Sequence, residues 1–549
     1  MRLRRVAAGC LLALVAALLG VAAWKVLQRG RPRGRLPGEL AWSIGYDPKT
    51  FDPAKVDDID SETVRYLTAG VLLRFNRLTQ KVEPQLAETW TLSPGGTTIT
   101  LRLRTGLRFS DGTALTSRDA AWSIRRVLLP ETGAPVADEF VAPTRVRVDA
   151  PDPQTVVVHL PHRVVGIGKV FDEIAIEPAN RPSEGRVTSG PFCVSEYRRS
   201  QYVRLRRNAY YAVRDASGAD LPRATGVLLD IVENPEEQIR LFERGELDLI
   251  DQLPPDYYEM LRQTTPQTVR DLGPSLNTEQ MWFNQSPAAP LPPWEKAWFR
   301  SQAFRVAVSQ AIHRDDLVRV VYRGHATPAY SFISPANSAW YNRELTAPHS
   351  DEAAARAGLL RAGFRLHGAR LEDAAGHPVK FSILTNAGND ARLKMATLIQ
   401  QDLAALGMQV NVVTLDFPAL VDRLMHTQNY EACLLGLENV DFDPNEMMNI
   451  WLSSSPNHQW NPSEKTPATA WEAEIDKEMN LQATSPSDAI RRVAVDRVQQ
   501  IVADEEPFIY LVYPNALVAI SPRIEGAQPA VIEPELWWNV EDLHLRGAQ

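Results

Sequence analysis

Helical and extended segments alternate through the second half of the chain, and this alternation constrains the fold more than any other feature of the sequence. Three segments carry apolar side chains at helical spacing and end at or next to a glycine, as helices commonly do. They are residues 301–324, 351–364 and 389–408. Short apolar runs typical of strands follow or intervene at residues 379–386, 408–416 and 430–437. Helices that alternate with strands predict an α/β fold here.

The first part of the chain, from residue 40 to about residue 272, mixes short strands, turns and two amphipathic helices. The helices are expected over residues 61–75 and from residue 234 to Gly245, which ends the second helix. Between them, residues 99–128 contain a strand, an Asp-Gly turn and a helix in succession. Thr116 stands three residues before Asp119, which is the spacing of an N-terminal capping box. This unit is compatible with many folds, so the rest of the chain must decide among them.

Length, charge and cysteine content limit the class of protein. At 549 residues the chain is too long for one hydrophobic core, so two or three domains are expected. The formal net charge of -8 argues against a large nucleic-acid surface, and no nucleic-acid partner is expected. A disulfide between Cys193 and Cys433 is not expected, and the third cysteine, Cys10, lies in the N-terminal segment.

The N-terminus carries a targeting or anchoring signal. A basic start is followed by an unbroken apolar run, Val6–Trp24. The run suits a signal peptide cleaved after Ala23, and it is also just long enough to cross a bilayer uncleaved. Basic residues follow it, from Lys25 to Arg35. The positive-inside rule places such residues on the cytoplasmic side, so they argue for the opposite orientation of the apolar run in the membrane. Cleavage and anchoring therefore both stay open.

Several segments resemble, in order, the family 5 extracellular solute-binding proteins, which are periplasmic receptors of ABC importers for peptides and nickel. The similar segments are residues 50–58, 82–127, 188–197, 203–211, 243–251, 283–290, 304–318, 359–364, 398–412 and 505–513. One of these motifs alone would be weak, but their shared order over nearly the whole chain is specific. In this family the stretch that contains Thr116 is structural, so it is interpreted as scaffold.

The resemblance implies a two-lobed α/β fold, like that of periplasmic binding proteins, with a small inserted subdomain in the first lobe and a hinge of two crossing strands. The crossings are expected near Thr278–Gln285 and Pro507–Pro514. The implied boundaries are 1–38 for the signal peptide or anchor with its basic linker, 39–278 for the first lobe with the subdomain at about 85–185, 279–511 for the second lobe, and 512–549 for the return to the first lobe.

The function implied by the resemblance is that of an extracytoplasmic substrate-binding protein of an ABC importer. It would capture a peptide or similar small solute between its lobes by hinge closure. The partners would be the permease subunits and, through the N-terminal segment, the membrane. We expect a periplasmic or membrane-anchored monomer that is not an enzyme and holds no cofactor and no metal.

Two charged residues clamp the ligand in relatives that bind free dipeptides: an Arg holds the carboxylate and an Asp holds the ammonium group. An ungapped alignment places Asn386 and Asn439 at these positions. Glu438 and Asp441, one and two residues from Asn439, are the alternative sources of a carboxylate. A desolvated zwitterion needs opposite charges. The sequence therefore predicts a longer peptide held by its main chain, or another solute, instead of a free short zwitterion.

Aromatic residues are further candidates to line the ligand cleft. Trp282, Trp451 and Trp460 are predicted to contact the ligand, with Asn284 near the first crossing strand. The alternative for each tryptophan is a place in the core. The alternative for residues 440–451 is an Asp-rich loop that caps a helix, and for Asn386 a loop position without ligand contact.

Three other functions are compatible with a chain of this length and composition. For a secreted hydrolase, neither an HExxH nor a GxSxG motif occurs, which leaves only a triad assembled in space from unclustered Ser, His and Asp residues. A metal site finds no support in the spacing of the histidines, which include His313, His325, His349 and His458. A membrane-anchored sensor or scaffold that keeps the fold without transport is favoured by the N-terminal run and by the altered clamp positions.

Overall fold

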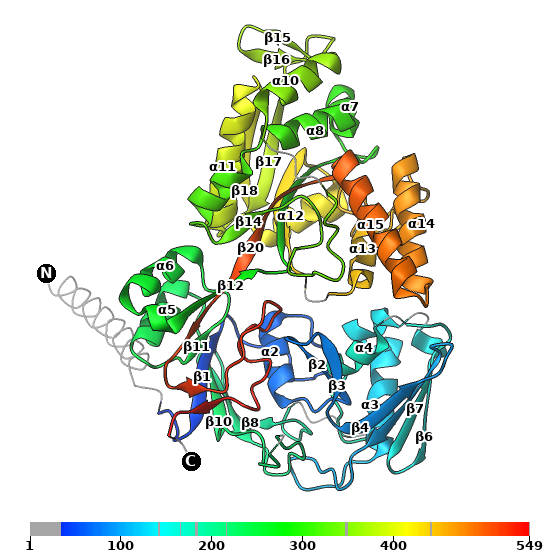
Figure 1. The fold of residues 1–549 in the computed structure, drawn as a ribbon, viewed down its shortest axis with the longest axis vertical. Helices are drawn as coiled ribbons and strands as arrows, with labels where there is room; N and C mark the ends of the chain where they lie inside the picture. Colours follow the sequence, from blue (N-terminus) through cyan, green and yellow to red (C-terminus); the bar gives the residue numbers. More distant parts are fainter. Residues whose placement is uncertain are drawn as a thin grey trace, which may run out of the picture.

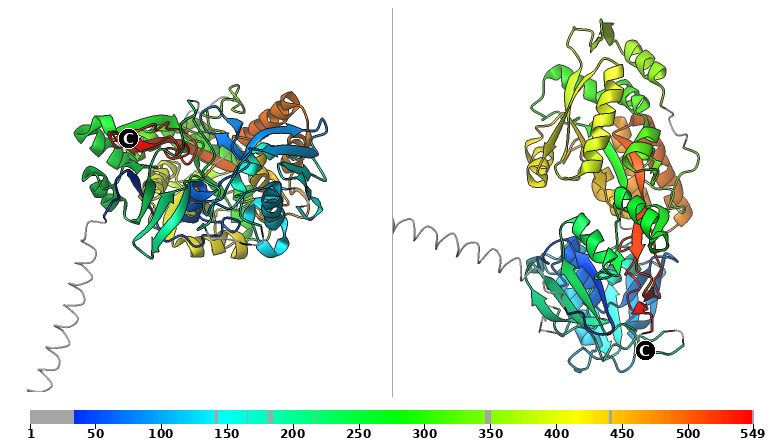
Figure 2. Two further views of the ribbon diagram at one scale, coloured as in Figure 1. Left: turned by 90° about the horizontal axis from the view of Figure 1, so that it is seen from below. Right: turned by 90° about the vertical axis from the view of Figure 1, so that its left-hand side faces the viewer.

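The computed structural model describes residues 34–547, except 141–142, 165, 180, 182–184, 216, 346–349 and 440–441. The described chain forms two lobes, one above the other, in which helices and strands are mixed (Figures 1 and 2). The predicted two-lobed α/β fold is confirmed. The N-terminal apolar run and the candidate Asp441 lie outside the described residues. In the described part of the chain, no helix is both long and apolar enough to cross a bilayer.

The lower lobe, here called the first lobe, is built around a four-stranded sheet with the order β1-β10-β9-β8. The strands are β1 (Glu39–Ile44), β8 (Phe192–Arg198), β9 (Tyr202–Arg207) and β10 (Gly226–Ile231). Helix α2 (Ile59–Thr68) packs against β8. Leu40 and Val227 from the sheet share one buried cluster with Trp537, so the C-terminal segment completes this core. That segment contains the short strands β21 (Ile524–Glu525) and β22 (His544–Leu545).

A second sheet lies at the far side of the first lobe, with the order β4-β5-β7-β6 (Figure 1). Its strands are β4 (Ala87–Leu92), β5 (Thr98–Leu103), β6 (Arg147–Asp152) and β7 (Thr155–His159). Helix α3 (Ser117–Leu128) packs on β6 and β7. Its capping box is confirmed, because the Thr116 backbone N–H donates to Asp119 Oδ2 at 2.8 Å. The hairpin β2 (Leu73–Asn76) and β3 (Lys81–Pro84), with α4 (Ile167–Glu173), adjoins this sheet.

The helix predicted over residues 61–75 is wrong in its second half. Helix α2 ends at Thr68, and Leu73 begins strand β2. The reason is a close backbone approach at Gly70, where an added Cβ would lie 2.6 Å from the Ser189 backbone. The sequence pattern could not show this contact, because Ser189 is far away in the chain.

The upper lobe, here called the second lobe, contains most of an eight-stranded sheet. The sheet has the order β11-β20-β13-β19-β17-β18, with β12 and β14 also paired to β20. The strands are β11 (Leu249–Ile250), β12 (Val269–Pro274), β13 (Thr278–Phe283), β14 (Ala326–Pro328), β17 (Lys380–Asn386), β18 (Gln409–Leu415), β19 (Ala432–Leu437) and β20 (Phe508–Ile520). The strands predicted at 379–386, 408–416 and 430–437 are thus confirmed as β17, β18 and β19.

Helices cover the sheet of the second lobe. They are α7 (Pro293–Arg300), α8 (Gln302–Ala311), α9 (Arg314–Asp316), α10 (Glu352–Arg361), α11 (Asp390–Ala405), α12 (Phe417–Val421), α13 (Met448–Trp451), α14 (Ala470–Thr484) and α15 (Asp488–Glu505). Helix α11 packs on β17 and β18, and a small hairpin, β15 (Arg365–His367) with β16 (Arg370–Glu372), lies at the top of the lobe (Figure 1). The helices predicted at 301–324, 351–364 and 389–408 are present.

Strand β20 links the two lobes (Figure 1). Its first half pairs with β13 and β14 in the second lobe, and its second half pairs with β12 and β11 on the side of the first lobe. The first passage between the lobes runs from β12 to β13. It lies beside β20, because the Ser275 N–H donates to the Pro514 carbonyl at 2.9 Å. Helices α5 (Pro235–Glu243) and α6 (Pro255–Thr264) flank this junction.

Candidate functional site

A cavity of about 200 Å³ lies where the two passages between the lobes run side by side. It is lined by Gln252, Leu253, Pro254, Pro255, Ser275, Asn277, Thr278, Glu279, Tyr322, Arg392, Gly436, Leu437, Glu438, Pro514, Asn515, Ala516, Leu517 and Glu535. Residues of both lobes therefore form its wall. We call it the hinge cavity.

An arginine–glutamate pair forms the wall on the side of the second lobe. Arg392, in the first turn of α11, donates from Nε to Glu279 Oε2 at 2.9 Å and from Nη2 to Oε1 at 3.1 Å. Glu279 lies on β13 opposite Gly436 of β19. A Cβ at Gly436 would overlap Arg392 Nη2 and lie 2.9 Å from Glu279 Oε1. The glycine therefore leaves the space in which this bidentate pair forms.

Three of the residues predicted from the alignment lie around the hinge cavity. Asn386, the last residue of β17, accepts a hydrogen bond from Arg392 Nη1 at 3.0 Å. Glu438 follows β19, is exposed and lines the cavity. Asn439 donates from Nδ2 to the Leu276 carbonyl at 2.9 Å, and its N–H donates to Asn277 at 2.9 Å.

Further carboxyl groups approach from the first lobe. Glu535 lines the cavity and is only 4% exposed, yet no described residue forms a hydrogen bond with its Oε2. Burial raises the pKa of Glu535 well above its usual range, and the charges of Asp251 and Glu533 raise it further. The pKa of Glu533 is also raised, first by burial and then by Glu438, although Asn277 Nδ2 donates to it at 3.3 Å. These carboxyl groups therefore bind protons more strongly than exposed ones.

The charges around the hinge cavity are unbalanced. Glu279, Glu438 and Glu535 line it, and Glu533 and Asp251 stand close behind. Among the described lining residues Arg392 is the only Lys or Arg, and it is already engaged by Glu279. A group of positive charge entering the cavity would thus meet carboxyl groups and would favour their ionised form, whereas a carboxylate would find no free cation.

The three tryptophans and Asn284 that we predicted to line the cleft lie elsewhere. Trp282, Trp451 and Trp460 are at most 1% exposed and belong to one hydrophobic core cluster of the second lobe. Asn284 is fully buried and donates to the main-chain carbonyls of residues 428 and 430. The structure therefore assigns these four side chains to packing: Trp282 lies on β13, which is buried on both faces, and the other three are buried at the end of α13, before α14 and directly after β13. They are left out of the proposed site.

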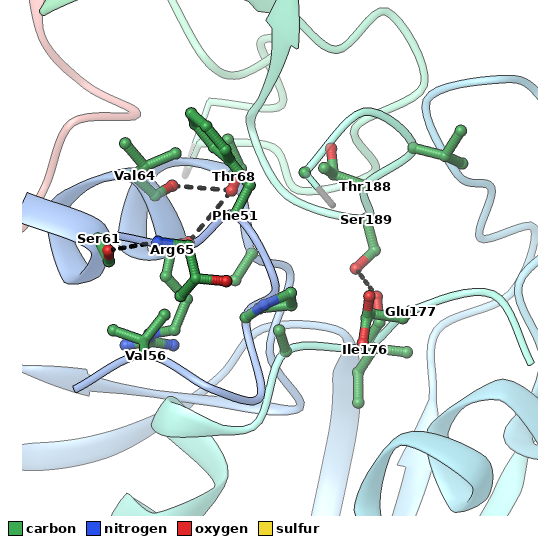
Figure 3. A pocket seen from close by; sticks show the side chains of 16 residues that line it. Phe51, Val56, Ser61, Val64, Arg65, Thr68, Ile176, Glu177, Thr188 and Ser189 are labelled. Carbon is green, nitrogen blue, oxygen red and sulfur yellow. Dashed lines mark hydrogen bonds between the residues drawn. The ribbon is translucent and has the colours of Figure 1, made fainter. Parts of the chain in front are cut away.

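A second, much smaller cavity lies within the first lobe, between α2 and residues 175–177 and 185–189 (Figure 3). Its volume is about 20 Å³, which is room for about one water molecule. Polar groups at its wall are already paired: Ser189 Oγ donates to the Ile176 carbonyl at 2.7 Å, and Thr68 Oγ1 donates to the Val64 carbonyl at 2.8 Å (Figure 3). We interpret it as a packing gap.

Sequence reasoning missed the residues that carry most of the charge in the hinge cavity. Glu279 and Arg392 lie in segments whose patterns predict a strand and a helix, and the two residues are 113 positions apart in the sequence. Glu535 comes from the C-terminal return, in which no motif was recognised. The position of Arg392 six residues after Asn386 is the one local signal that could have drawn attention to it.

Comparison with known proteins supplies independent information. The family model described as "Bacterial extracellular solute-binding proteins, family 5 Middle" matches residues 81–459, which is more than half of the chain. A probable ABC transporter-binding protein of Deinococcus radiodurans is 25% identical over 71% of this chain and 72% of its own length. The oligopeptide-binding protein AppA of Bacillus subtilis is 23% identical over 90% of each chain.

Solved structures show the same fold. The ABC transporter substrate-binding protein CtaP of Listeria monocytogenes matches with a TM-score of 0.77 and 22% identity, over 93% of this chain and 100% of the other. AppA of Bacillus subtilis, solved in complex with a nonapeptide, matches with a TM-score of 0.72 and 20% identity, over 93% and 100% of the two chains.

Proposed function

This chain belongs to the bacterial extracellular solute-binding proteins of family 5, and we propose that it captures a peptide or similar solute between its two lobes and delivers it to an ABC importer. The importer role is supported by the relatives, which include a transporter-binding protein and an oligopeptide-binding protein. The relatives are receptors, and we expect the solute to leave chemically unchanged.

Capture by hinge closure follows from the way in which the lobes are joined. Two passages connect them, β12 to β13 and the long strand β20, and the hinge cavity lies beside both. Small rotations in residues 275–277 and around Pro514 would move Glu438 and Arg392 relative to Glu535. Such motion encloses a ligand between two lobes and completes its contacts.

We further propose that the hinge cavity receives a cationic group of the solute, such as a peptide amino terminus. The observation that carries this proposal is Glu535: a buried carboxyl group at the cavity wall with no described partner for Oε2, whose ionised form an entering cation would stabilise. An ammonium group supplies both a charge and hydrogen-bond donors to such an oxygen. Glu438, exposed on the facing lobe, is placed to supply the second carboxylate.

The rest of the solute is expected to lie outside the hinge cavity. The cavity is smaller than the 300–1,000 Å³ that is usual for a whole drug-sized ligand. No free cation is offered to a ligand carboxylate by the described lining residues, since Arg392 is paired with Glu279. This arrangement favours a longer peptide, or an amine without a carboxylate, over a free dipeptide. Asn386, Glu438 and Asn439 remain in the proposed site; Asp441, outside the described residues, is kept as a candidate.

A competition experiment tests the cationic preference. The purified full-length protein is equilibrated with a mixed-sequence pentapeptide pool, either with free amino termini or N-acetylated, and bound peptides are identified by mass spectrometry. We expect retention of the free pool only. Equal retention of both pools would contradict the cationic site but leave peptide binding intact, whereas retention of neither would contradict a peptide ligand.

Variants then locate the site. Glu535→Gln keeps the shape of the side chain but cannot ionise when an ammonium group enters, and we expect at least about tenfold weaker binding of a retained peptide, since a charge-assisted hydrogen bond contributes about 1.5–3 kcal/mol. Glu525→Gln is the matched control, because Glu525 lies in the same C-terminal segment but pairs with Arg546 at the surface. Equal loss in both variants would count against a role of Glu535 in the site.

We also propose that residues 6–24 direct the protein to the extracytoplasmic side and that it acts there as a monomer. The basic start and the apolar run support export. Membrane fractionation and N-terminal sequencing of the native protein separate cleavage after Ala23 from retention as an anchor, and sedimentation tests the monomer.

A further inference from the structure

A second group of charged side chains lies inside the second lobe, apart from the hinge cavity. His458, Glu464 and Glu472 each offer one ligand atom, and these three atoms all lie within 4.8 Å of one another. His458 and Glu464 come from the segment between α13 and α14, and Glu472 comes from the first turn of α14. None of the three lines the hinge cavity. We call this group the His458 cluster.

The histidine is held with one ring nitrogen free. His458 is 1% exposed, and its Nδ1 lies 2.9 Å from the Ile450 carbonyl. A carbonyl only accepts, so Nδ1 carries the hydrogen and, in the neutral ring, Nε2 carries a lone pair. No described residue forms a hydrogen bond with Nε2. This orientation, with one nitrogen bound to a backbone carbonyl and the other left open, is the one that metal-binding histidines adopt.

The distances from Nε2 to the two carboxylates exceed those of hydrogen bonds. Nε2 lies 3.6 Å from Glu464 Oε1 and 3.6 Å from Glu472 Oε1. An N–H···O hydrogen bond would measure about 2.7–3.2 Å. Ligands of a zinc ion stand about 2.0–2.2 Å from the metal, which places two ligand atoms of a tetrahedral site about 3.4 Å apart. The spacing therefore suits three groups that share one ion.

Other side chains hold both carboxylates in place. Trp460 Nε1 donates to Glu472 Oε1 at 2.9 Å, and Thr469 Oγ1 donates to Oε2 at 2.8 Å. Asn461 Nδ2 donates to Glu464 Oε1 at 2.7 Å. Hydrogen bonds of this kind orient metal ligands and fix their direction. They also leave each Oε1 with a further lone pair.

The charge of the cluster calls for a cation. The side chains of Glu464 and Glu472 are only 4% and 3% exposed, and two buried carboxylates close together are costly unless a positive charge lies between them. Two occupants satisfy this requirement: a proton, on Nε2 or on one of the two carboxyl groups, or a metal ion. A proton would be expected to draw Nε2 within hydrogen-bond distance of at least one carboxylate, and the structure shows 3.6 Å to both.

We propose that His458, Glu464 and Glu472 form a binding site for a first-row divalent metal ion of the Zn²⁺ class. One imidazole and two carboxylates are ligands that zinc accepts, with a fourth position left for water. The ion would link the segment of residues 452–469 to helix α14, close to Trp460. This role is structural and does not depend on which solute the hinge cavity receives.

Metal binding to the full-length protein tests the site. After removal of metals with a chelator and dialysis, the protein is titrated with ZnCl₂ by calorimetry and, separately, with CoCl₂ by visible absorption. We expect one equivalent of Zn²⁺ to bind, the thermal midpoint to rise with Zn²⁺, and Co²⁺ to give the absorption of a tetrahedral or five-coordinate site. Absence of stoichiometric binding would overturn the proposal and leave the proton as the occupant.

Variants show whether the ion binds at this cluster. Glu464→Gln and His458→Gln are expected to weaken Zn²⁺ binding at least about 100-fold, because loss of a ligand exceeds the 10–100-fold effect of an outer contact. His426→Gln is the control, since His426 is an exposed histidine of the same lobe. Equal affinity in all variants would mean that the ion binds elsewhere and would also overturn the proposal. Should either cluster variant fail to fold, the Co²⁺ spectrum of the unmodified protein remains decisive.

Discussion

Gly436 decides, at the scale of single residues, whether the wall of the hinge cavity can form. The hydrogen-bonded side chains of Arg392 and Glu279 lie directly against Gly436. A side chain at this position would occupy the space of the Arg392 guanidinium. We expect Gly436→Ala to separate the pair and to lower the free energy of unfolding by about 1–3 kcal/mol, since Glu279 would be left buried without its partner. Urea denaturation of both proteins measures the difference.

Gly358 provides the control for this substitution. It lies within helix α10, and a Cβ there would meet nothing within 4 Å. Gly358→Ala is expected to raise stability by about 0.5–1 kcal/mol, because alanine loses less backbone entropy in a helix than glycine. If both alanines had the same effect on stability, the close contact at Gly436 would not be the cause.

The carboxyl groups of the first lobe make stability depend on pH. Burial raises the pKa of Glu535 and of Glu533, so the folded state keeps their protons at a pH where the unfolded state has released them. Between the ordinary carboxyl pKa of about 4 and the raised values, the folded state binds more protons, and stability therefore falls as pH rises. This contribution favours the folded state more at about pH 5 than at about pH 8.

Glu535→Gln isolates that contribution. The variant has no titrating group at this position, so its unfolding free energy should decrease less between about pH 5 and about pH 8 than that of the unmodified protein. Urea titrations at both pH values give the comparison, and Glu525→Gln serves again as the exposed control. An unchanged pH dependence in Glu535→Gln would contradict the raised pKa.

At the scale of helices and strands, the capping box of α3 is a motif that stabilises the fold and that we expect to take no part in ligand binding. Asp119 accepts from the Thr116 backbone and hydroxyl through Oδ2, and from the Ala179 N–H through Oδ1 at 3.0 Å. We expect Asp119→Ala to cost about 1–2 kcal/mol, because these donors lose their acceptor. Peptide affinity should stay the same, since α3 does not line the hinge cavity. Denaturation and a peptide-binding assay on the same sample test both statements, and a large loss of affinity would contradict the scaffold role.

At the scale of the whole molecule, strand β20 is the central element, because it contributes residues to the hydrophobic cores of both lobes. Its residues contribute to the buried clusters of the second lobe through Leu511 and of the first through Val518. Contacts near it tie the lobes together: His325, beside β14, lies 2.6 Å from Asp271 of β12 and 2.8 Å from Glu259 of α6. These contacts lie beside the two passages between the lobes. We therefore expect bending in the short segments between the strands.

Closure is a prediction for the molecule as a whole. Addition of a peptide retained from the free pool should lower the radius of gyration measured by small-angle X-ray scattering, because the lobes approach each other when a ligand bridges them. The N-acetylated pool is the control and should leave the scattering curve unchanged. Binding without any change in the curve would argue for a preformed closed state.

The sequence by itself determined most of the helices and strands of the second lobe and indicated the family. Periodicity identified the helices at 389–408 and 351–364 and the strands β17, β18 and β19, because these segments obey local rules of spacing and termination. The order of motifs indicated the two-lobed fold. The domain limits implied by the resemblance stay predictions, as does the N-terminal segment.

Only the tertiary structure decided where charges meet. The partnership of Arg392 with Glu279, the approach of Glu535 and the convergence of His458 with Glu464 and Glu472 all depend on how elements pack. It also decided that Trp282, Trp451 and Trp460 belong to the core and that α2 stops before Gly70. The physical reason is that electrostatic and steric contacts act through space, whereas a sequence pattern reports only on neighbours along the chain.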